Sequence, residues 1–106
     1  MGSEKQRDRK TAQLCAQALR TLSTALAELG DPTLRELSIE SVVPAPDASR
    51  LLVRVYFQRP PAEIDAASIL EKLRTVRGFL RAEMASAINR RRASELDFQL
   101  VVTETT

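Results

Sequence analysis

The chain has 106 residues and carries 16 Lys and Arg against 14 Asp and Glu, with one cysteine and no histidine. This composition excludes an intrachain disulfide and a Cys/His metal set, and we expect no cofactor. Without an apolar N-terminal segment, or an apolar run near the ~20 residues that cross a bilayer, it also predicts a cytoplasmic protein with no membrane partner. A chain of this length fits one domain. Its core must be mostly aliphatic, because Phe and Tyr together number four, and this leaves little room for a small-molecule substrate.

Apolar residues of the segment 12–29 recur at spacings of three and four, which marks one face of a helix. They are Cys15, Leu19, Leu22, Leu26 and Leu29. The helix should end at Gly30, a candidate C-cap, because the following Asp31-Pro32 does not readily continue it. Cys15 lies on the apolar face, so we interpret it as a buried side chain rather than as a reactive thiol.

Residues 37–43 and 51–58 alternate apolar and polar side chains, the two-residue period of half-buried strands. Between them, residues 44–49 contain two prolines, which lack the N–H that a ladder needs, and an Asp and a Ser that favour turns. The two strands should form an antiparallel hairpin with an irregular connection. Phe57 falls on the apolar side, so we assign it to the core in preference to base stacking.

A further helix is predicted from Ala66, with Asp65 as its N-cap. Apolar residues continue at helical spacing: Ile69, Leu73, Val76, Leu80, Met84 and Ala87. An unbroken helix to Arg91 would be ~39 Å long, longer than a small domain, and would leave Phe79 away from the apolar side. We therefore expect a break at Gly78 that divides this segment into two helices and turns Phe79 toward the core.

A third alternating segment, residues 96–102, predicts the last strand. The order helix, strand, strand, helix, helix, strand indicates an α+β fold in which helices cover one face of a three-stranded sheet. We expect a single domain over residues 9–102, with flexible ends at 1–8 and 103–106.

Charge is unevenly distributed along the chain. Residues 71–93 carry seven Lys and Arg against two acids, whereas residues 94–106 carry three acids and no base. Such a basic block is the footprint of a polyanion-binding surface, although an ordinary solvated helix face has the same composition. No phosphate loop, histidine base or pair of carboxylates in an apolar setting accompanies it, so we do not expect an enzyme.

Three arginines of the basic block, Arg74, Arg77 and Arg81, are spaced so that they share one side of a helix. A second cluster follows one helix length later: Arg90, Arg91 and Arg92. Guanidinium groups bind phosphates with planar, two-pronged geometry. If a new helix starts at Gly78, its first backbone N–H groups can bind a phosphate as well.

Simpler interpretations exist for the same residues. Arg74 can pair with Glu71, and the stem of Arg91 can pack against the core while its head reaches water. Gly78 can simply allow the helix to bend, without any role in binding a phosphate.

Several short motifs, in a fixed order, occur together in this chain. They are Asp31-Pro32 with Leu34 and Leu37, Asp47 with Val53 and Val55, Gly78-Phe79-Leu80-Arg81, and Glu95-Leu96-Asp97-Phe98. With these residues the chain resembles the bacterial ribosome-binding factor A family over residues 9–102. The resemblance implies a type II KH-like fold whose usual Gly-x-x-Gly loop is replaced by an Ala-x-Gly kink between two helices. Here the kink reads Val76-Arg77-Gly78.

The resemblance also implies a monomer that binds the immature small ribosomal subunit and its RNA, and that assists late maturation, rRNA processing and growth in the cold. Attachment, without turnover, would be its activity. The residues that it assigns to RNA binding are Arg74, Arg77, Gly78, Arg81, Arg90, Arg91, Arg92, Arg9 and Lys10. Two other hypotheses stay open: a protein-interaction module that uses the uncovered sheet face or a strand edge, and a general RNA chaperone.

Overall fold

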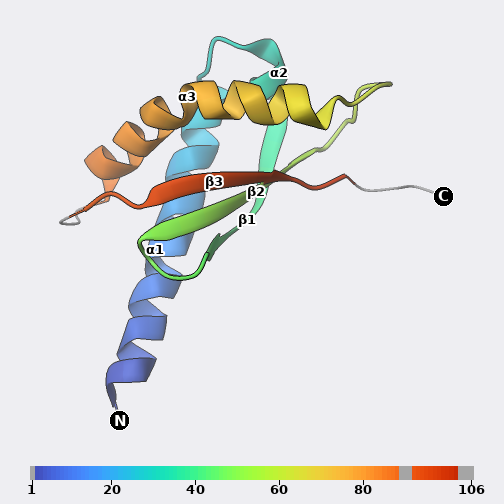
Figure 1. Ribbon diagram of the computed structural model, residues 1–106. Helices are drawn as coiled ribbons and strands as arrows, with labels where there is room; N and C mark the ends of the chain where they lie inside the picture. The colour runs from blue at the N-terminus through green and yellow to red at the C-terminus, as the bar shows by residue number, and fades with distance from the viewer. Residues whose placement is uncertain (1, 89–91, 103–106) are drawn as a thin grey trace.

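The computed structural model describes the backbone of residues 2–88 and 92–102, and the side chains of residues 9–88 and 92–102. The elements within these ranges are α1 (Gly2–Ala27), α2 (Pro32–Arg35), β1 (Leu37–Pro44), β2 (Arg50–Phe57), α3 (Ala66–Ala87) and β3 (Glu95–Leu100). Together they make the α+β fold that was predicted, with α1 and α3 packed against a three-stranded sheet (Figure 1). Of the helices in the described ranges, none has the length and apolar content to cross a membrane.

The sheet has the order β1-β2-β3. Strands β1 and β2 are antiparallel and pair from Leu37↔Phe57 to Pro44↔Leu51, which confirms the predicted hairpin. Strand β3 runs parallel to β2, with Leu51 opposite Leu96. A parallel neighbour needs a crossover connection, and α3 supplies it. The end of α3 and the start of β3 are thereby brought next to the start of β2.

One face of the sheet packs against the helices and the other does not. Along β2, Leu51, Val53, Val55 and Phe57 are buried, and the residues between them are partly exposed. Opposite them are the buried side chains of the two long helices: Leu14, Cys15, Ala18, Leu22, Ala25 and Leu26 of α1, and Ile69, Leu73, Leu80 and Met84 of α3. The assignments of Cys15 and Phe57 to the core are both confirmed.

Helix α2 is a single turn that the sequence analysis did not predict. Pro32 opens it, a position where the fixed φ of proline suits a helix and its missing N–H is not needed. The Asp31 side chain caps this turn by accepting hydrogen bonds from the backbone N–H of Thr33 at 2.8 Å and of Leu34 at 3.4 Å. Helix α1 already ends at Ala27, before the predicted Gly30, so Asp31-Pro32 does not end it but begins α2, whose Leu34 is buried.

The expected break at Gly78 is wrong. Helix α3 continues as one α-helix from Ala66 to Ala87, although its axis bends in Figure 1. Gly78 needs no special conformation, because its φ is not positive and an added Cβ would meet no heavy atom within 4 Å. The length that suggested a break is accommodated because α3 ends sooner than predicted, at Ala87 rather than at Arg91.

The domain limits of 9–102 and the flexibility of both ends stay predictions. Helix α1 begins at Gly2, so its backbone extends over most of the segment that was expected to be flexible. Residue 1 and residues 103–106 lie outside the described residues.

Candidate nucleic-acid interface

Helix α3 holds its three arginines in fixed directions. At its start the Asp65 side chain accepts a hydrogen bond from the Ser68 backbone N–H at 3.2 Å, which caps the first turn. Further along, Leu73 and Leu80 are fully buried, so the helix cannot rotate about its axis. Arg74 is exposed and Arg77 and Arg81 are half-buried, side by side along one flank.

Two of these arginines form ion pairs at the surface. Arg74 Nη1 lies 3.2 Å from Glu71 Oε2, the pairing that the sequence analysis considered. Arg81 Nη2 lies 3.0 Å from Glu95 Oε1, and it also donates to the Ala93 carbonyl oxygen at 3.4 Å. Exposed pairs of this kind contribute little to stability, about 0–1 kcal/mol. A phosphate can therefore compete with either carboxylate.

Arg77 differs from its two neighbours. Among residues 9–88 and 92–102 it forms no ion pair; its Nε is shielded from water without a hydrogen-bond partner, as is the Nε of Arg81. A guanidinium with unused donors, half-buried between two other cations, is the strongest candidate here for binding an anion.

The backbone contribution expected at Gly78 is wrong. Because α3 is continuous there, the backbone N–H groups that follow Gly78 lie in the interior of a helix, where each donates to the carbonyl four residues earlier. No helix N-terminus exists at this point to bind a phosphate. What Gly78 does provide is a stretch of helix surface without a side chain.

The second basic cluster is only partly described. Arg92 is exposed, whereas Arg90 and Arg91 lie outside the described residues. Arg92 borders a small hollow together with Leu14 of α1 and Ile88, and Lys10 of α1 borders another that also includes Leu14 and Ile88.

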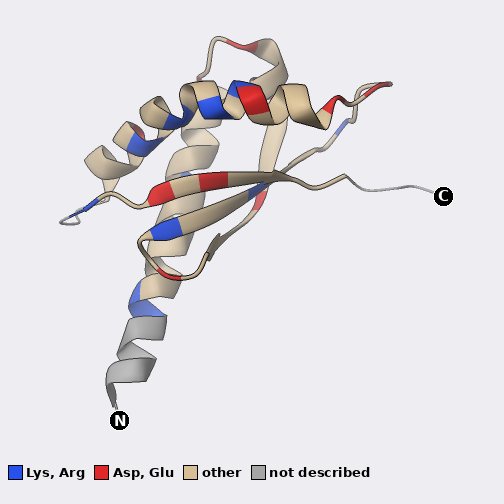
Figure 2. Ribbon diagram, viewed as in Figure 1, with Lys and Arg blue, Asp and Glu red and all other residues tan. Residues whose placement is uncertain are grey.

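Basic residues of α1, the last turns of α3 and the segment after it lie toward the same end of the molecule, and Arg74 and Arg77 lie farther back along α3. The exposed Arg9 and Lys10 of α1 lie at the end where α3 finishes and where Arg92 follows. Figure 2 shows the basic residues along α3 and after it, and the acidic ones at the start of β3. This surface, which we call the α3 basic surface, comprises Arg74, Arg77, Arg81, Arg92, Arg9 and Lys10.

Comparison with solved structures identifies the family. The crystal structure of ribosome-binding factor A from Thermus thermophilus superimposes with a TM-score of 0.73 at 31% sequence identity, covering 85% of this chain and 93% of that one. This chain belongs to the ribosome-binding factor A family. No family model and no curated protein sequence matches it.

Two further structures agree with this assignment to the ribosome-binding factor A family. A homology model of the Thermus thermophilus protein, fitted into a cryo-EM map of a complex with the 30S subunit, has a TM-score of 0.64 at 30% identity and covers 80% of this chain and 88% of that one. The solution NMR structure of a candidate ribosome-binding factor A from Thermotoga maritima has a TM-score of 0.71 at 25% identity, with 92% of each chain covered. The KH-like fold class is confirmed, with α3 as one helix in place of two.

The uncovered sheet face of this ribosome-binding factor A chain is polar and largely paired with itself. Arg50 Nη1 lies 3.0 Å from Asp97 Oδ2, and Arg54 Nη1 lies 3.3 Å from Glu40 Oε1. Arg54 Nε also donates to Gln99 Oε1 at 3.2 Å. These groups satisfy one another across neighbouring strands, which is typical of a solvated face.

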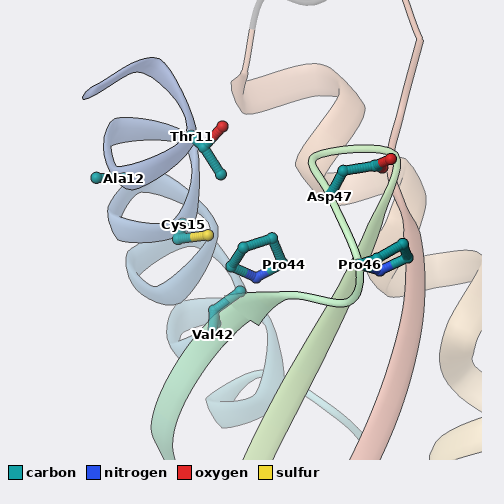
Figure 3. Close-up of a pocket in the computed structure, with 7 residues that line it drawn as sticks. All are labelled: Thr11, Ala12, Cys15, Val42, Pro44, Pro46 and Asp47. Atoms are coloured by element: carbon teal, nitrogen blue, oxygen red, sulfur yellow. The ribbon is translucent and has the colours of Figure 1, made fainter. Parts of the chain in front are cut away.

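A hollow of about 600 Å³ opens between α1 and the β1–β2 connection (Figure 3). In it the Cys15 sulfur points toward Pro44. Burial raises the pKa of the Cys15 thiol, which keeps it protonated and weakly nucleophilic at neutral pH. The residues that the structure describes contain no group of three or more His, Cys, Asp or Glu that could hold a metal. Nothing in this hollow suggests an active site.

Two residues near the α3 basic surface were missed by the sequence analysis. Glu95 pairs with Arg81 only because β3 returns beside the end of α3, and no local spacing signals that contact. Phe79 was expected to turn into the core, yet 46% of it is exposed. The helical spacing of an unbroken helix already placed Phe79 away from the apolar side, and therefore toward solvent. The expected break at Gly78 led to the opposite prediction.

Proposed function

We propose that this protein binds the immature small ribosomal subunit through the phosphates of its RNA, and that it assists late maturation and rRNA processing. The observation that carries the proposal is the α3 basic surface in a chain of this family. A relative from Thermus thermophilus was fitted into a map of a complex with the 30S subunit. The activity is attachment: the protein occupies a site, holds RNA in a non-final arrangement and leaves without making or breaking a bond.

The arginines act on phosphates in two ways. Arg77 has unused donors and binds directly. Arg74 and Arg81 exchange a carboxylate for a phosphate, which keeps the number of charge-assisted hydrogen bonds constant while releasing counterions from the RNA. These contacts carry no information about base identity, so recognition of the site depends on RNA shape.

Arg92, Arg9 and Lys10 extend the same surface beyond the end of α3, and Arg90 and Arg91, which lie outside the described residues, are assigned to RNA binding as well. The protein acts as a monomer in the compartment where ribosomes assemble, the cytoplasm, and its loss slows growth in the cold. It has no catalytic activity of its own.

The uncovered sheet face is a poorer candidate interface, because its charged groups already pair with one another.

Neutralising the unpaired arginine together with one of the paired arginines tests the proposal. The double variant Arg77→Gln with Arg81→Gln should no longer co-sediment with small subunits in a sucrose gradient at physiological salt. The matched control is Arg35→Gln with Arg59→Gln, which changes the net charge equally. Both control residues are exposed and border a common hollow beside the end of β2, whereas Arg81 pairs with Glu95 next to the start of β2, and the two ends of this strand are about 25 Å apart.

Thermal melts show whether each variant is folded, so a loss of stability is not mistaken for a loss of binding. If the first variant, folded, sediments with small subunits as the wild type does, the assigned surface is wrong. If the control loses binding to the same extent, the interaction depends on net charge and not on the α3 basic surface.

A further inference from the structure

Phe79 is an exposed aromatic residue in the middle of a well-packed helix. Within the described part of the chain, the large hydrophobic residues that are exposed are Val43, Phe79 and Val102. Val43 lies near the end of β1 and Val102 follows β3, whereas α3 continues for about three turns before Phe79 and about two turns after it. The phenyl ring therefore sits on a rigid support, which the other two lack.

About half of the Phe79 side chain is open to solvent, with 46% of it exposed. On the helix surface its nearest neighbours are one turn away: Thr75, Ala82 and Glu83 are exposed, and Val76 is half-buried. Beside it, Gly78 contributes no side chain, and an added Cβ there would meet no heavy atom within 4 Å. A planar ligand can therefore reach the exposed part of the ring.

The ring and the arginines lie on opposite flanks of the exposed side of α3. At 3.6 residues per turn, Phe79 is about 140° around the helix from Arg74. Between these two directions lie Gly78 and Ala82, which are small and exposed. A chain that crosses the helix here meets cations on one flank and an aromatic ring on the other, separated by roughly the 10 Å width of a helix.

We infer that Phe79 is a stacking platform for one unpaired base of the bound RNA, with the phosphates of the same strand on Arg74 and Arg81. This inference rests on the proposed function and adds a ligand class to it: the RNA segment at α3 is single-stranded or carries an unstacked base. Aromatic side chains stack on any base, because every base has a π-face, so the platform requires no particular sequence.

A base fits this site better than a protein partner does. Stable protein interfaces bury more than about 1,000 Å² around an apolar centre. Phe79 is instead the one exposed large hydrophobic residue of α3, and the three arginines lie on the opposite flank of the same helix. Isolated aromatics interleaved with cations are the usual composition of surfaces that bind single-stranded nucleic acid.

The chain contains no tryptophan, so Phe79→Trp creates a unique fluorescent reporter at the platform. The probes are an RNA stem-loop with an unpaired loop and a blunt duplex with the same number of phosphates. We expect the fluorescence of the Phe79→Trp protein to be quenched by the stem-loop and not by the duplex. The matched control, Tyr56→Trp on the uncovered sheet face, should show no quenching with either RNA.

The binding affinity for the two RNA probes provides a second, independent test of the stacking platform. Phe79→Ala should weaken binding of the stem-loop about tenfold, the range known for loss of one stacked base, and leave binding of the duplex unchanged. Phe79→Leu, which keeps the apolar volume without the π-face, should also lose most of the preference for the stem-loop. Because Phe79 is half-exposed, all three variants should fold.

The outcomes separate the inference from the function on which it rests. If the stem-loop binds with wild-type affinity to Phe79→Ala, or leaves the fluorescence of the Phe79→Trp protein unchanged, the platform does not exist while the phosphate contacts remain. Loss of binding to small subunits by Phe79→Ala, with stem-loop binding intact, would show that Phe79 contacts a protein, and would likewise overturn it. If neither RNA binds the wild type, the proposed function fails together with the inference.

Discussion

Arg81 Nη2 lies 3.0 Å from Glu95 Oε1, and this contact joins the last turns of α3 to the first residue of β3. Both side chains are partly exposed, at 43% and 47%. The pair holds a cation of the α3 basic surface next to an anion that any approaching phosphate must displace. Glu95 is therefore positioned to weaken RNA binding.

Removing that anion should strengthen binding. In Glu95→Gln, Arg81 loses its competing partner and the surface loses one negative charge, so affinity for RNA should rise several-fold at low salt. Stability should change by less than about 1 kcal/mol, because the pair is exposed. Fluorescence anisotropy with labelled RNA measures the affinity. Glu63→Gln, the same charge change at an exposed loop position before α3, controls for net charge. Weaker binding by Glu95→Gln would mean that Glu95 positions Arg81 productively.

Binding should depend steeply on salt. If about five phosphates are neutralised, the logarithm of the affinity falls against the logarithm of salt concentration with a slope of roughly −4, on the scale of duplex nucleic acid. The double variant Arg77→Gln with Arg81→Gln should lower the steepness by about 2, since two phosphate contacts are lost. Titrations at several salt concentrations give both slopes. Equal slopes for the two proteins would exclude these arginines from the interface.

Gly78→Ala should stabilise the protein. Gly78 is exposed, lies inside a continuous helix and has open space where a Cβ would be. Alanine restricts the unfolded chain and favours the helix, so the free energy of unfolding should rise by about 0.5–1 kcal/mol. Urea denaturation measures this change. The reverse substitution at a matched site one turn later, Ala82→Gly, should lower it by a similar amount. A destabilised Gly78→Ala protein would show that the bend of α3 requires glycine.

Acid should weaken the link between α2 and α3. The hydrogen bond from Lys72 Nζ, at 2.9 Å, lowers the pKa of Asp31, and those from the Thr33 and Leu34 backbone N–H groups lower it further. Because the folded pKa lies below the unfolded value of about 3.9, the carboxylate stabilises the fold fully above that pH. This contribution is lost as pH falls through the folded pKa.

The variant Asp31→Asn isolates the charge, because asparagine also caps helices well. It should be less stable than the wild type at pH 7, and the difference should shrink below about pH 4. Urea midpoints at neutral and acid pH test this expectation. A difference that does not vary with pH would assign the role of Asp31 to its capping hydrogen bonds alone.

Local patterns were sufficient for most of the fold. The alternation around Val53 placed β2 to within a residue, and the turn residues between the strands placed the hairpin connection. The helical spacing of Leu22 and Leu26 gave the buried face of α1. These features are set by neighbouring residues, through the periods of strands and helices, so they can be predicted without knowing what lies opposite.

The candidate site was predictable only as a set of cations. The spacing of Arg74, Arg77 and Arg81 showed that they share one flank of a helix. It did not show that Arg77 alone among them would remain unpaired in the described structure, nor that Glu95 would reach Arg81. Those facts depend on the parallel return of β3, which no local pattern encodes.

By itself the sequence determined the α+β class, the hairpin, the aliphatic core and the basic character of α3, because each follows from side-chain period and composition over a few turns. Tertiary structure decided that α3 continues through Gly78 and that Phe79 faces water. A glycine in a helix costs about 1 kcal/mol, and the burial of Leu73 and Leu80 on either side of it outweighs that cost. The burial of apolar side chains on both sides of Gly78, and not the low helix propensity of glycine, therefore determined that α3 is continuous.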